Sequence, residues 1–386
     1  MTETGNAPRI RLLIMTDTAI LGPGGSERFL RNLLQRLPVE RYAIDVLQLV
    51  PEPDRDECIA GLAAPGVRLL YCPIGASYGL RGLRALGHVR GRVRRREYDI
   101  VQSQHEKADL INAFLPRRAG VGRISNRRDM GFQKSTLLSA LFRRINTRFD
   151  RIVAPTPHII DALVADENVD RAICGAIANG VDTQRFEPAT SVRRARLRAD
   201  LGLGADALAI GCVASFTPVK RHADLVAAFA LVHKTYPQAQ LLLIGEGPLR
   251  AEIEAQTEAL GITAQVRLLG ARSDVENLLP ALDVFALASR TEGMSNAILE
   301  AQACGVAVVA TAVGGNLELV EPGHTGLVAP PLAPAAFADA LARMLADAAA
   351  RQAMGRAARA RVERLHSLDA MAAAYDRLYQ SLARVD

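Results

Sequence analysis

The sequence predicts an α/β protein with two doubly wound, Rossmann-like domains. Short apolar segments alternate with amphipathic segments along most of the 386 residues, which is typical of parallel sheets covered by helices. The alternation runs through the first 180 residues, meets a polar, arginine-rich stretch at 191–200, and then starts again. A chain of 41.5 kDa is also longer than a single hydrophobic core needs, so two domains are expected.

The first domain is predicted over residues 1–180. Its opening strand, 9–15, leads into a glycine-rich loop, and Ser26 is placed to cap the helix that follows. The other strands expected in this half are 43–50, 67–71, 99–101, 119–125, 151–154 and 172–178, with helices at 107–115 and 135–148.

The second domain is predicted over residues 181–365, after the turn residues 179–182. Its expected strands are 208–214, 240–244, 266–269, 284–288, 306–310 and 326–328, with helices at 223–236, 249–260, 296–303, 337–345 and 350–365. Ligands of open parallel sheets bind at the carboxyl ends of the strands, so two facing domains of this kind predict a deep cleft between them.

Positive charge is concentrated in the first domain. Residues 1–180 hold 27 Lys and Arg against 19 Asp and Glu, whereas residues 181–386 hold 20 against 22. The excess peaks in seven arginines: Arg81, Arg84, Arg90, Arg92, Arg94, Arg95 and Arg96. A solvated helix face explains this run best and an anionic membrane surface comes second. Nucleic acid is a distant third, because aromatic residues make up only 4% of the chain.

Composition argues against several other classes. The longest apolar runs are too short to span a bilayer, and the first residues lack the pattern of an export signal, so a cytoplasmic protein is expected. The five cysteines are widely spaced without a Cys-x-x-Cys pair, which argues against a disulfide framework or a thiolate zinc site. Asp54-Arg-Asp56 formally matches a metal-binding Asp-x-Asp, but it lacks a preceding apolar strand and is interpreted as solvated.

The most informative motif spans residues 289–305. An apolar strand leads through a loop to a helix that Ser295 or Asn296 can cap, and free N–H groups at such a helix start bind anions. Glu292 in the loop and Glu300 about one turn into the helix are spaced to hold two separate vicinal diols. A nucleotide sugar offers two diols with a diphosphate between them. The alternative is that Glu300 merely stabilises the helix dipole.

Three further features favour the same kind of ligand. Lys220 follows a buried strand at a helix start, in a chain with 43 arginines and only four lysines, which favours a cation for phosphate oxygens. The Gly24-Gly25 loop allows backbone N–H groups to approach an anion, although a plain turn explains it better. His105 follows the strand at 99–101 and is expected at the ligand edge of its sheet.

These motifs resemble those of the retaining glycosyltransferases of family 4, which have the GT-B fold. The most specific match is the Glu-x7-Glu pair formed by Glu292 and Glu300. Further matches, which bring the resemblance to most of the chain, are 301–311, Gly314-Gly315-Asn316-Leu317-Glu318, Gly24-Gly25-Ser26-Glu27, 179–182 with Phe186, 245–250 and Gly270. The resemblance also implies that a last segment, 366–386, forms a helix that packs back on the first domain.

The resemblance implies a role for each candidate residue. Glu292 would hold hydroxyls of the donor sugar, Glu300 the ribose, and Lys220 the diphosphate, with His105 near the donor sugar. Catalysis is assigned to Lys220, Glu292, His105 and Arg221. Donor and nucleotide binding is assigned to Gly24, Gly25, Gly293, Met294, Ser295, Asn296, Leu299 and Glu300.

One position departs from the family pattern. The family usually carries an arginine about five residues before its lysine, and Ser215 stands there in this chain. Arg221, directly after Lys220, is the expected substitute, since a lost cation at a leaving phosphate is costly. Without a convincing set of metal ligands, catalysis is expected to need neither a metal nor another cofactor.

The function that the resemblance implies is that of a retaining hexosyltransferase. It would move a sugar from a nucleotide sugar, a UDP-sugar by family frequency, to a glycan or lipid-linked acceptor in bacterial polysaccharide or glycoconjugate synthesis. Two alternatives stay open: a nucleotide-sugar epimerase of the same fold, and a catalytically weak nucleotide-sugar-binding subunit. If the basic run binds lipid, the protein would lie on the inner face of the cell membrane.

Overall fold

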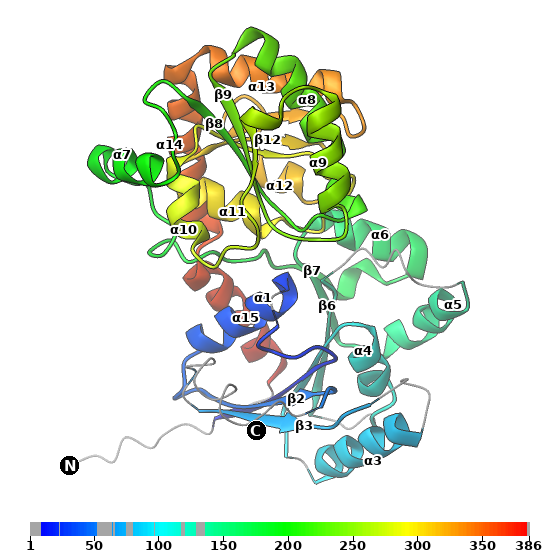
Figure 1. Ribbon diagram of the computed structural model, residues 1–386. Coiled ribbons are helices and arrows are strands. Elements are labelled where there is room, and N and C mark those ends of the chain that lie inside the picture. The colour runs from blue at the N-terminus through cyan, green and yellow to red at the C-terminus, as the bar shows by residue number, and fades with distance from the viewer. Residues whose placement is uncertain are drawn as a thin grey trace, which may run out of the picture. The chain divides into compact units, whose positions relative to one another are not determined.

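The chain folds into two compact units (Figure 1). The computed structural model describes residues 9–22, 24–51, 64, 66–74, 80–95, 97–116, 120–128 and 136–383. Unit 1 takes in residues up to Gly180 together with those from Leu368 onward, and unit 2 takes in Val181–Ser367. Residues 366 and 367 thus lie in unit 2, whereas the sequence places them with the last helix.

Unit 1 is built on a parallel sheet with the strand order β3-β2-β1-β4-β5-β6-β7. Its strands are β1 (Ile10–Thr16), β2 (Tyr42–Gln48), β3 (Val67–Tyr71), β4 (Ile100–Gln104), β5 (Gly122–Asn126), β6 (Arg151–Ala154) and β7 (Cys174–Ala176). The order reverses direction between β1 and β4, which pair in parallel as neighbours. This is the topological switch point of a doubly wound sheet.

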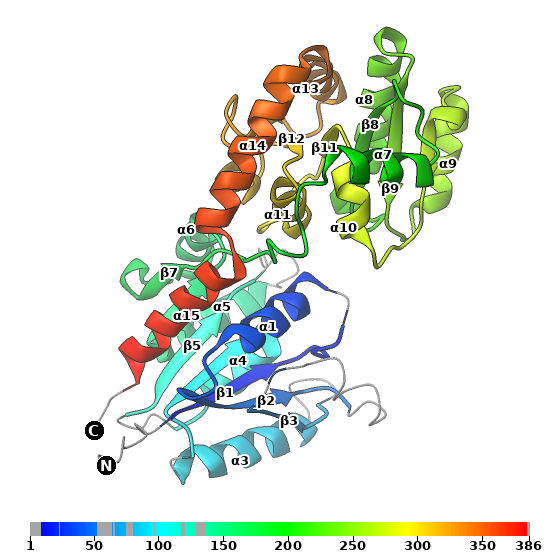
Figure 2. The same ribbon diagram turned by 90° about the vertical axis from the view of Figure 1, so that its left-hand side faces the viewer.

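The last helix of the chain completes the core of unit 1. Helices α1 (Gly25–Arg36) and α15 (Leu368–Leu382) lie side by side over one face of the sheet (Figure 2), and the rings of Phe29 and Tyr375 are 5.4 Å apart between centroids. The other helices of this unit are α3 (Leu80–Arg94), α4 (Glu106–Ala113), α5 (Thr136–Ile145) and α6 (Pro157–Glu167).

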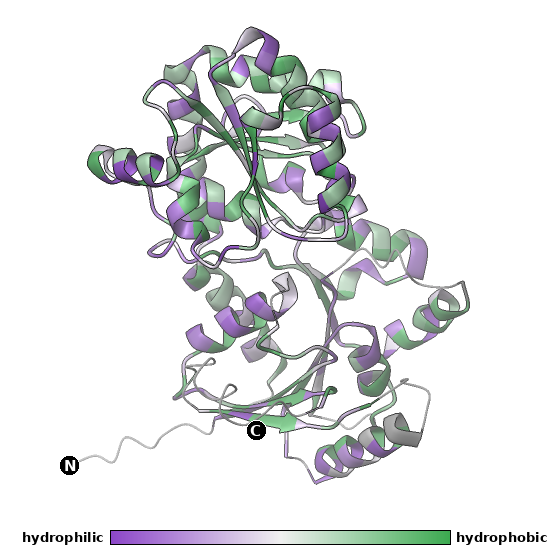
Figure 3. Ribbon diagram, viewed as in Figure 1, coloured by the Kyte–Doolittle hydropathy of each residue, from purple (hydrophilic) through white to green (hydrophobic). Residues whose placement is uncertain are grey.

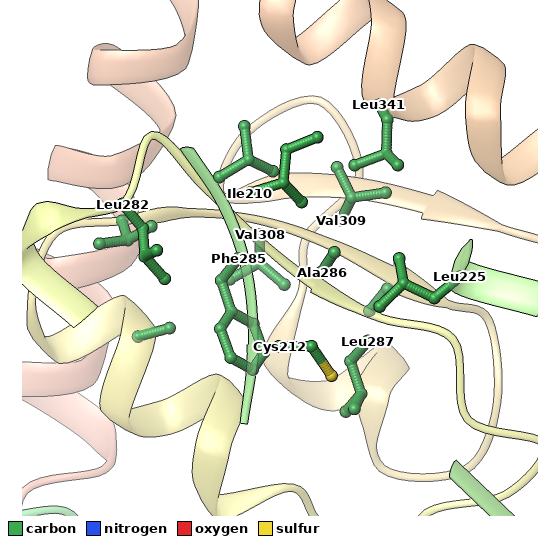
Figure 4. Packing of buried hydrophobic residues seen from close by; sticks show 14 of the residues in the cluster. Ile210, Cys212, Leu225, Leu282, Phe285, Ala286, Leu287, Val308, Val309 and Leu341 are labelled. Atoms are coloured by element: carbon green, nitrogen blue, oxygen red, sulfur yellow. The ribbon is translucent and has the colours of Figure 1, made fainter. Parts of the chain in front are cut away.

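Unit 2 repeats the plan with the strand order β10-β9-β8-β11-β12-β13, again all parallel. Its strands are β8 (Leu208–Val213), β9 (Ala239–Ile244), β10 (Val266–Leu268), β11 (Val284–Leu287), β12 (Ala307–Thr311) and β13 (Gly326–Ala329). Figure 4 shows how Ile210, Phe285 and Val308, from neighbouring strands, fill its core. The switch point lies between β8 and β11.

The helices of unit 2 show green hydrophobic residues together with purple hydrophilic ones (Figure 3). They are α7 (Ser191–Asp200), α8 (His222–Thr235), α9 (Arg250–Ala259), α10 (Val275–Leu278), α11 (Asn296–Ala303), α12 (Asn316–Leu319), α13 (Pro334–Ala346) and α14 (Ala348–Leu365). The arginine-rich stretch 191–200, to which the sequence pattern assigned neither a helix nor a strand, is the helix α7. Its arginines pair with acids of the same unit, as Arg194 does with Asp283 at 2.8 Å.

Candidate functional site

The candidate residues follow the strands that flank the two switch points. In unit 2, Lys220 comes after β8 and Glu292 after β11, and these strands are neighbours. In unit 1, Asp17 follows β1 directly and His105 follows β4 directly. Parallel strands leave their carboxyl ends at one edge of the sheet, where ligands of doubly wound sheets bind. Each unit therefore places its candidates at the edge that suits a ligand.

Lys220 and Glu292 form the centre of the site in unit 2. The Lys220 Nζ lies 2.6 Å from Glu292 Oε1, and the Ser289 hydroxyl donates to the same oxygen, also at 2.6 Å. The Glu292 side chain is 8% exposed and that of Lys220 is 25% exposed. The ammonium group is thus held beside a nearly buried carboxylate while it keeps access to solvent.

Backbone hydrogen bonds hold the two loops of this pair together. The Arg290 N–H donates to the Val219 carbonyl at 2.8 Å, which joins the loop after β11 to the short 3₁₀ turn Pro218–Lys220. The Thr311 hydroxyl donates to the Ser289 carbonyl at 2.6 Å and ties the same loop to the end of β12. The geometry of the pair is therefore fixed from both sides.

Two glycines support these loops by close approach. A Cβ at Gly314, whose φ is +47°, would lie 1.9 Å from the Glu292 carbonyl oxygen, and the next N–H, of Gly315, donates to that oxygen at 3.1 Å. A Cβ at Gly245 would lie 2.0 Å from the Ala214 carbonyl oxygen, in the loop that leads to Lys220. Sequence reasoning assigned no role to Gly245. The sequence signal that could have found Gly245 is its position directly after β9, because β9 is the neighbour of β8 and Lys220 follows β8.

The start of α11 lies just after Glu292. Ser295 is its N-cap, since its hydroxyl accepts from the Ile298 N–H at 3.3 Å, which decides between the two predicted caps. Glu300 lies in the second turn and is 4% exposed. The Leu299 side chain is fully buried in the core of unit 2, so its assignment to the donor site stays a prediction that only its backbone could fulfil.

Arg221 and His222 follow Lys220 in different environments. The Arg221 guanidinium makes two hydrogen bonds to Asp224, at 2.7 and 2.8 Å, and its backbone adopts a φ of +52°, which is rare for a side chain of this size. His222 is fully buried against Phe216. Burial, together with the charge of Lys220, lowers the pKa of His222 to about 4, so its ring is neutral at pH 7.

His105 is the centre of the site in unit 1. Its Nε2 lies 2.8 Å from the Ser26 hydroxyl, and its backbone has a φ of +69° at the N-cap of α4. Asp17 is close enough for its charge to interact with His105, and burial raises the pKa of this carboxyl group. Strained backbone of this kind is concentrated at functional sites.

The glycine loop has a different geometry from the one predicted. Gly24 is the N-cap of α1 and Gly25 its first residue, so Ser26 lies inside the helix and makes no capping hydrogen bond. The Ser26 hydroxyl is used for His105 instead. Asp54 and Asp56 lie outside the described residues.

None of the helices in the described part of the chain is long and apolar enough to cross a bilayer. Within the same ranges, no group of three or more His, Cys, Asp and Glu side chains is arranged to hold a metal ion.

Both units match models of known families. The model described as Glycosyltransferase Family 4 matches residues 23–185, and the one described as Glycosyl transferases group 1 matches residues 193–361. EpsF of Bacillus subtilis is 30% identical over 295 residues, 73% of this chain and 74% of its own. A D-inositol 3-phosphate glycosyltransferase of Corynebacterium jeikeium is 27% identical over 390 residues, 93% of this chain and 92% of its own.

A third relative is more similar over a shorter span. A GDP-mannose-dependent monoacylated alpha-(1-6)-phosphatidylinositol monomannoside mannosyltransferase of Corynebacterium glutamicum is 36% identical over 217 residues. This match covers 54% of this chain and 56% of the relative, so it spans little more than half of either protein.

Solved structures share the fold. HepE of Anabaena, crystallised with UDP, has a TM-score of 0.84 at 21% identity, over 96% of this chain and 100% of that one. Two parallel doubly wound sheets and the match to HepE identify the GT-B fold. The chain belongs to the family 4, group 1 glycosyltransferases.

Proposed function

We propose that this glycosyltransferase moves a sugar from a UDP-sugar to a glycan or lipid-linked acceptor, without a metal ion and with retention of anomeric configuration. The observation that carries the proposal is the Lys220–Glu292 pair at the switch point of unit 2, next to the start of α11. The pair supplies one cation and one carboxylate in fixed positions, as a diphosphate attached to a sugar requires.

Each side chain of unit 2 then has its own task. Lys220 donates to the departing diphosphate, and the N–H groups at the start of α11 add to the same positive potential. Glu292, released from Lys220 by the phosphate, accepts from hydroxyls of the donor sugar, while Glu300 accepts from the ribose. Arg221 is the second cation, provided that the phosphate competes with Asp224 for it.

The reaction itself is a substitution at the anomeric carbon. The acceptor oxygen forms a bond to that carbon on the face from which the phosphate oxygen departs, so the configuration is retained. The phosphate oxygen that leaves with the C–O bonding electrons takes the proton of the acceptor hydroxyl. His105, Gly24 and Gly25 are the proposed contacts of unit 1 to the donor.

Names of related proteins support the substrate classes. HepE is described in complex with UDP-glucose, and an Escherichia coli relative, 25% identical over 343 residues, is a UDP-Gal:alpha-D-GlcNAc-diphosphoundecaprenol alpha-1,3-galactosyltransferase. A relative from Corynebacterium glutamicum uses GDP-mannose according to its name. These names support a nucleotide-sugar donor, a glycoconjugate acceptor, and action in bacterial glycoconjugate synthesis.

The first test is a panel of UDP-, GDP- and ADP-sugars, with release of the free nucleotide as the readout. Release is expected with a UDP-sugar, to be unchanged by a chelator, and to give a product whose anomeric proton coupling matches that of the donor. Sugar isomerisation without net release would identify an epimerase instead. Tight binding without turnover on any acceptor would identify a binding subunit, and activity restored only by manganese would contradict metal independence.

Glu300→Ala is expected to weaken UDP binding by about tenfold or more, because a hydrogen bond from a charged group to the ribose is lost. Calorimetric titration of UDP measures this. Glu258→Ala, at an exposed position of α9, is the matched control and should bind like the unchanged chain. Equal UDP affinity of Glu300→Ala and the control would show that Glu300 serves only the helix.

The membrane proposal depends on α3. Its residues Arg84, Arg90 and Arg94 are exposed, as is Arg95 just after it, but Arg95 and Arg92 pair with Glu97 at 2.7 and 2.6 Å. The side chain of Arg81 and all of Arg96 lie outside what the structure describes. Arg84, Arg90 and Arg94 are tested because they are the exposed arginines of α3 itself.

Sedimentation with vesicles of increasing anionic lipid content tests this surface. Binding is expected to rise with anionic lipid and to fall with salt, since each arginine near such a leaflet contributes about 1 kcal/mol. The triple change Arg84→Gln, Arg90→Gln and Arg94→Gln should abolish it. The matched control changes Arg196, Arg356 and Arg364, exposed arginines of unit 2, to glutamine. A protein that stays in the supernatant at low salt has a soluble acceptor.

A further inference from the structure

Arg128 carries a positive charge for which the described residues supply no carboxylate. Its Nη2 donates to the Asn179 side-chain oxygen, and its Cζ lies 3.5 Å from the centroid of the Phe29 ring. Its Nη1 is buried, and the described part of the chain offers it no hydrogen-bond partner. Burial lowers the pKa of Arg128, and the nearby Tyr375 hydroxyl opposes that effect.

The preceding residue, Arg127, shows what a structural arginine looks like here. Arg127 is 5% exposed and pairs with two carboxylates, Asp109 at 2.8 Å and Glu167 at 3.2 Å. A buried charge that lacks such a partner costs stability. The contrast between these two adjacent arginines indicates that the charge of Arg128 serves to bind a ligand and not to stabilise the fold.

Two buried amides lie at the same edge of the sheet as Arg128. Asn126 is the last residue of β5 and pairs in register with Gln104, the last residue of β4. Both side chains are buried, and within the described residues Asn126 Oδ1 and Gln104 Nε2 have no hydrogen-bond partner. The Asn126 Nδ2 donates to the Tyr375 hydroxyl at 3.1 Å, and this is the hydroxyl that acts on Arg128.

We propose that Arg128, with Gln104 and Asn126, binds a phosphate group of the acceptor. A guanidinium binds phosphate oxygens through paired N–H donors, and an amide N–H of Gln104 adds a third donor. The Asn126 carbonyl then accepts from a hydroxyl next to the phosphate. This inference rests on the proposed transferase function, and it assigns to unit 1 an anion subsite separate from the one that Lys220 provides in unit 2.

The experiment measures binding of inorganic phosphate to the full chain in a Lys220→Ala background, which removes the cation of unit 2. Isothermal titration and thermal melting give the affinity and the rise in Tm caused by the bound anion. Arg128→Gln is expected to weaken phosphate binding about tenfold or more and to abolish the rise in Tm. Arg128→Lys should retain part of the binding. Arg144→Gln, at an exposed position of α5, is the matched control and should change neither value.

Stability without phosphate separates this role from a structural one. Arg128→Gln should melt at the same temperature as its parent or higher in phosphate-free buffer, because it removes a partly buried charge for which the described residues supply no counter-charge. A variant that melts well below its parent and still binds phosphate equally well would overturn the proposal. Equal phosphate affinity of the parent and Arg128→Gln would overturn it in any case.

The source of the phosphate is decided by two further titrations. Glycerol 3-phosphate represents a soluble phosphate ester, and a short-chain prenyl diphosphate in detergent represents a lipid-linked acceptor. Whichever of the two loses more affinity in Arg128→Gln identifies the source. UDP binding by the otherwise unchanged chain and by its Arg128→Gln variant is measured in parallel. If UDP binds but no phosphate binds at Arg128, this inference alone is rejected. If the unchanged chain turns over none of the nucleotide sugars, the proposed function is rejected.

Discussion

Lys220→Ala is expected to lower turnover by about 100-fold or more, because the departing diphosphate loses its closest cation. In the unchanged chain the Glu292 carboxylate lies 2.6 Å from the Lys220 ammonium group. The change therefore leaves this nearly buried carboxylate without its counter-charge. Initial rates of nucleotide release with the active donor measure the effect, and UDP affinity should fall with them.

The control for this change is Lys234→Ala. Lys234 is an exposed lysine near the end of α8, the helix that begins two residues after Lys220. It should leave the rate unchanged, which excludes a general effect of removing positive charge from unit 2. A rate within threefold of the unchanged chain for Lys220→Ala would reject Lys220 as the phosphate cation. Arg221→Ala then asks whether the guanidinium bound to Asp224 shares that task.

Glu292→Gln is expected to separate donor binding from turnover. The amide keeps the shape of the side chain and loses the charge that binds Lys220 and accepts from Ser289. Turnover should fall by about 100-fold, since hydroxyls of the sugar lose a charged acceptor. UDP affinity should hold or rise, because Lys220 no longer has to leave a carboxylate for the phosphate.

The matched control is Glu321→Gln, which removes a carboxylate paired with Arg361 at 2.7 Å on the surface of the same unit. It should alter neither value. A double-mutant cycle of Lys220→Ala with Glu292→Gln adds a direct measure, with an expected coupling of at least about 1 kcal/mol in UDP binding. Additive effects would mean that the observed pair does not act as a unit.

The pattern of alternating strands and helices was sufficient to predict both sheets. The order β1-β4 and β8-β11 at the switch points follows from the rules of doubly wound sheets, which is why His105, Lys220 and Glu292 could be placed at strand ends. The stretch 191–200 was missed as a helix because its periodicity is carried by arginines, whose aliphatic stems and ion pairs do the packing.

The site was harder to predict where a contact joins distant segments. No local rule tells that Ser26, in the first turn of α1, turns to His105 instead of capping its helix. Arg127 and Arg128 are adjacent and chemically identical in the sequence. Only the fold distinguishes Arg127, which has two carboxylates, from Arg128, for which the described residues supply none.

The position of α15 has a consequence for synthesis on the ribosome. Tyr375 and Tyr379 are fully buried in the core of unit 1, yet they are translated after all of unit 2. At ordinary elongation rates this delay is about 10 to 40 seconds. For that time the core that α1 and α15 build together on this face of the sheet lacks α15, while unit 2, whose residues are contiguous, can complete its own core as it emerges. The half of the enzyme that is made first is thus the half that finishes folding last.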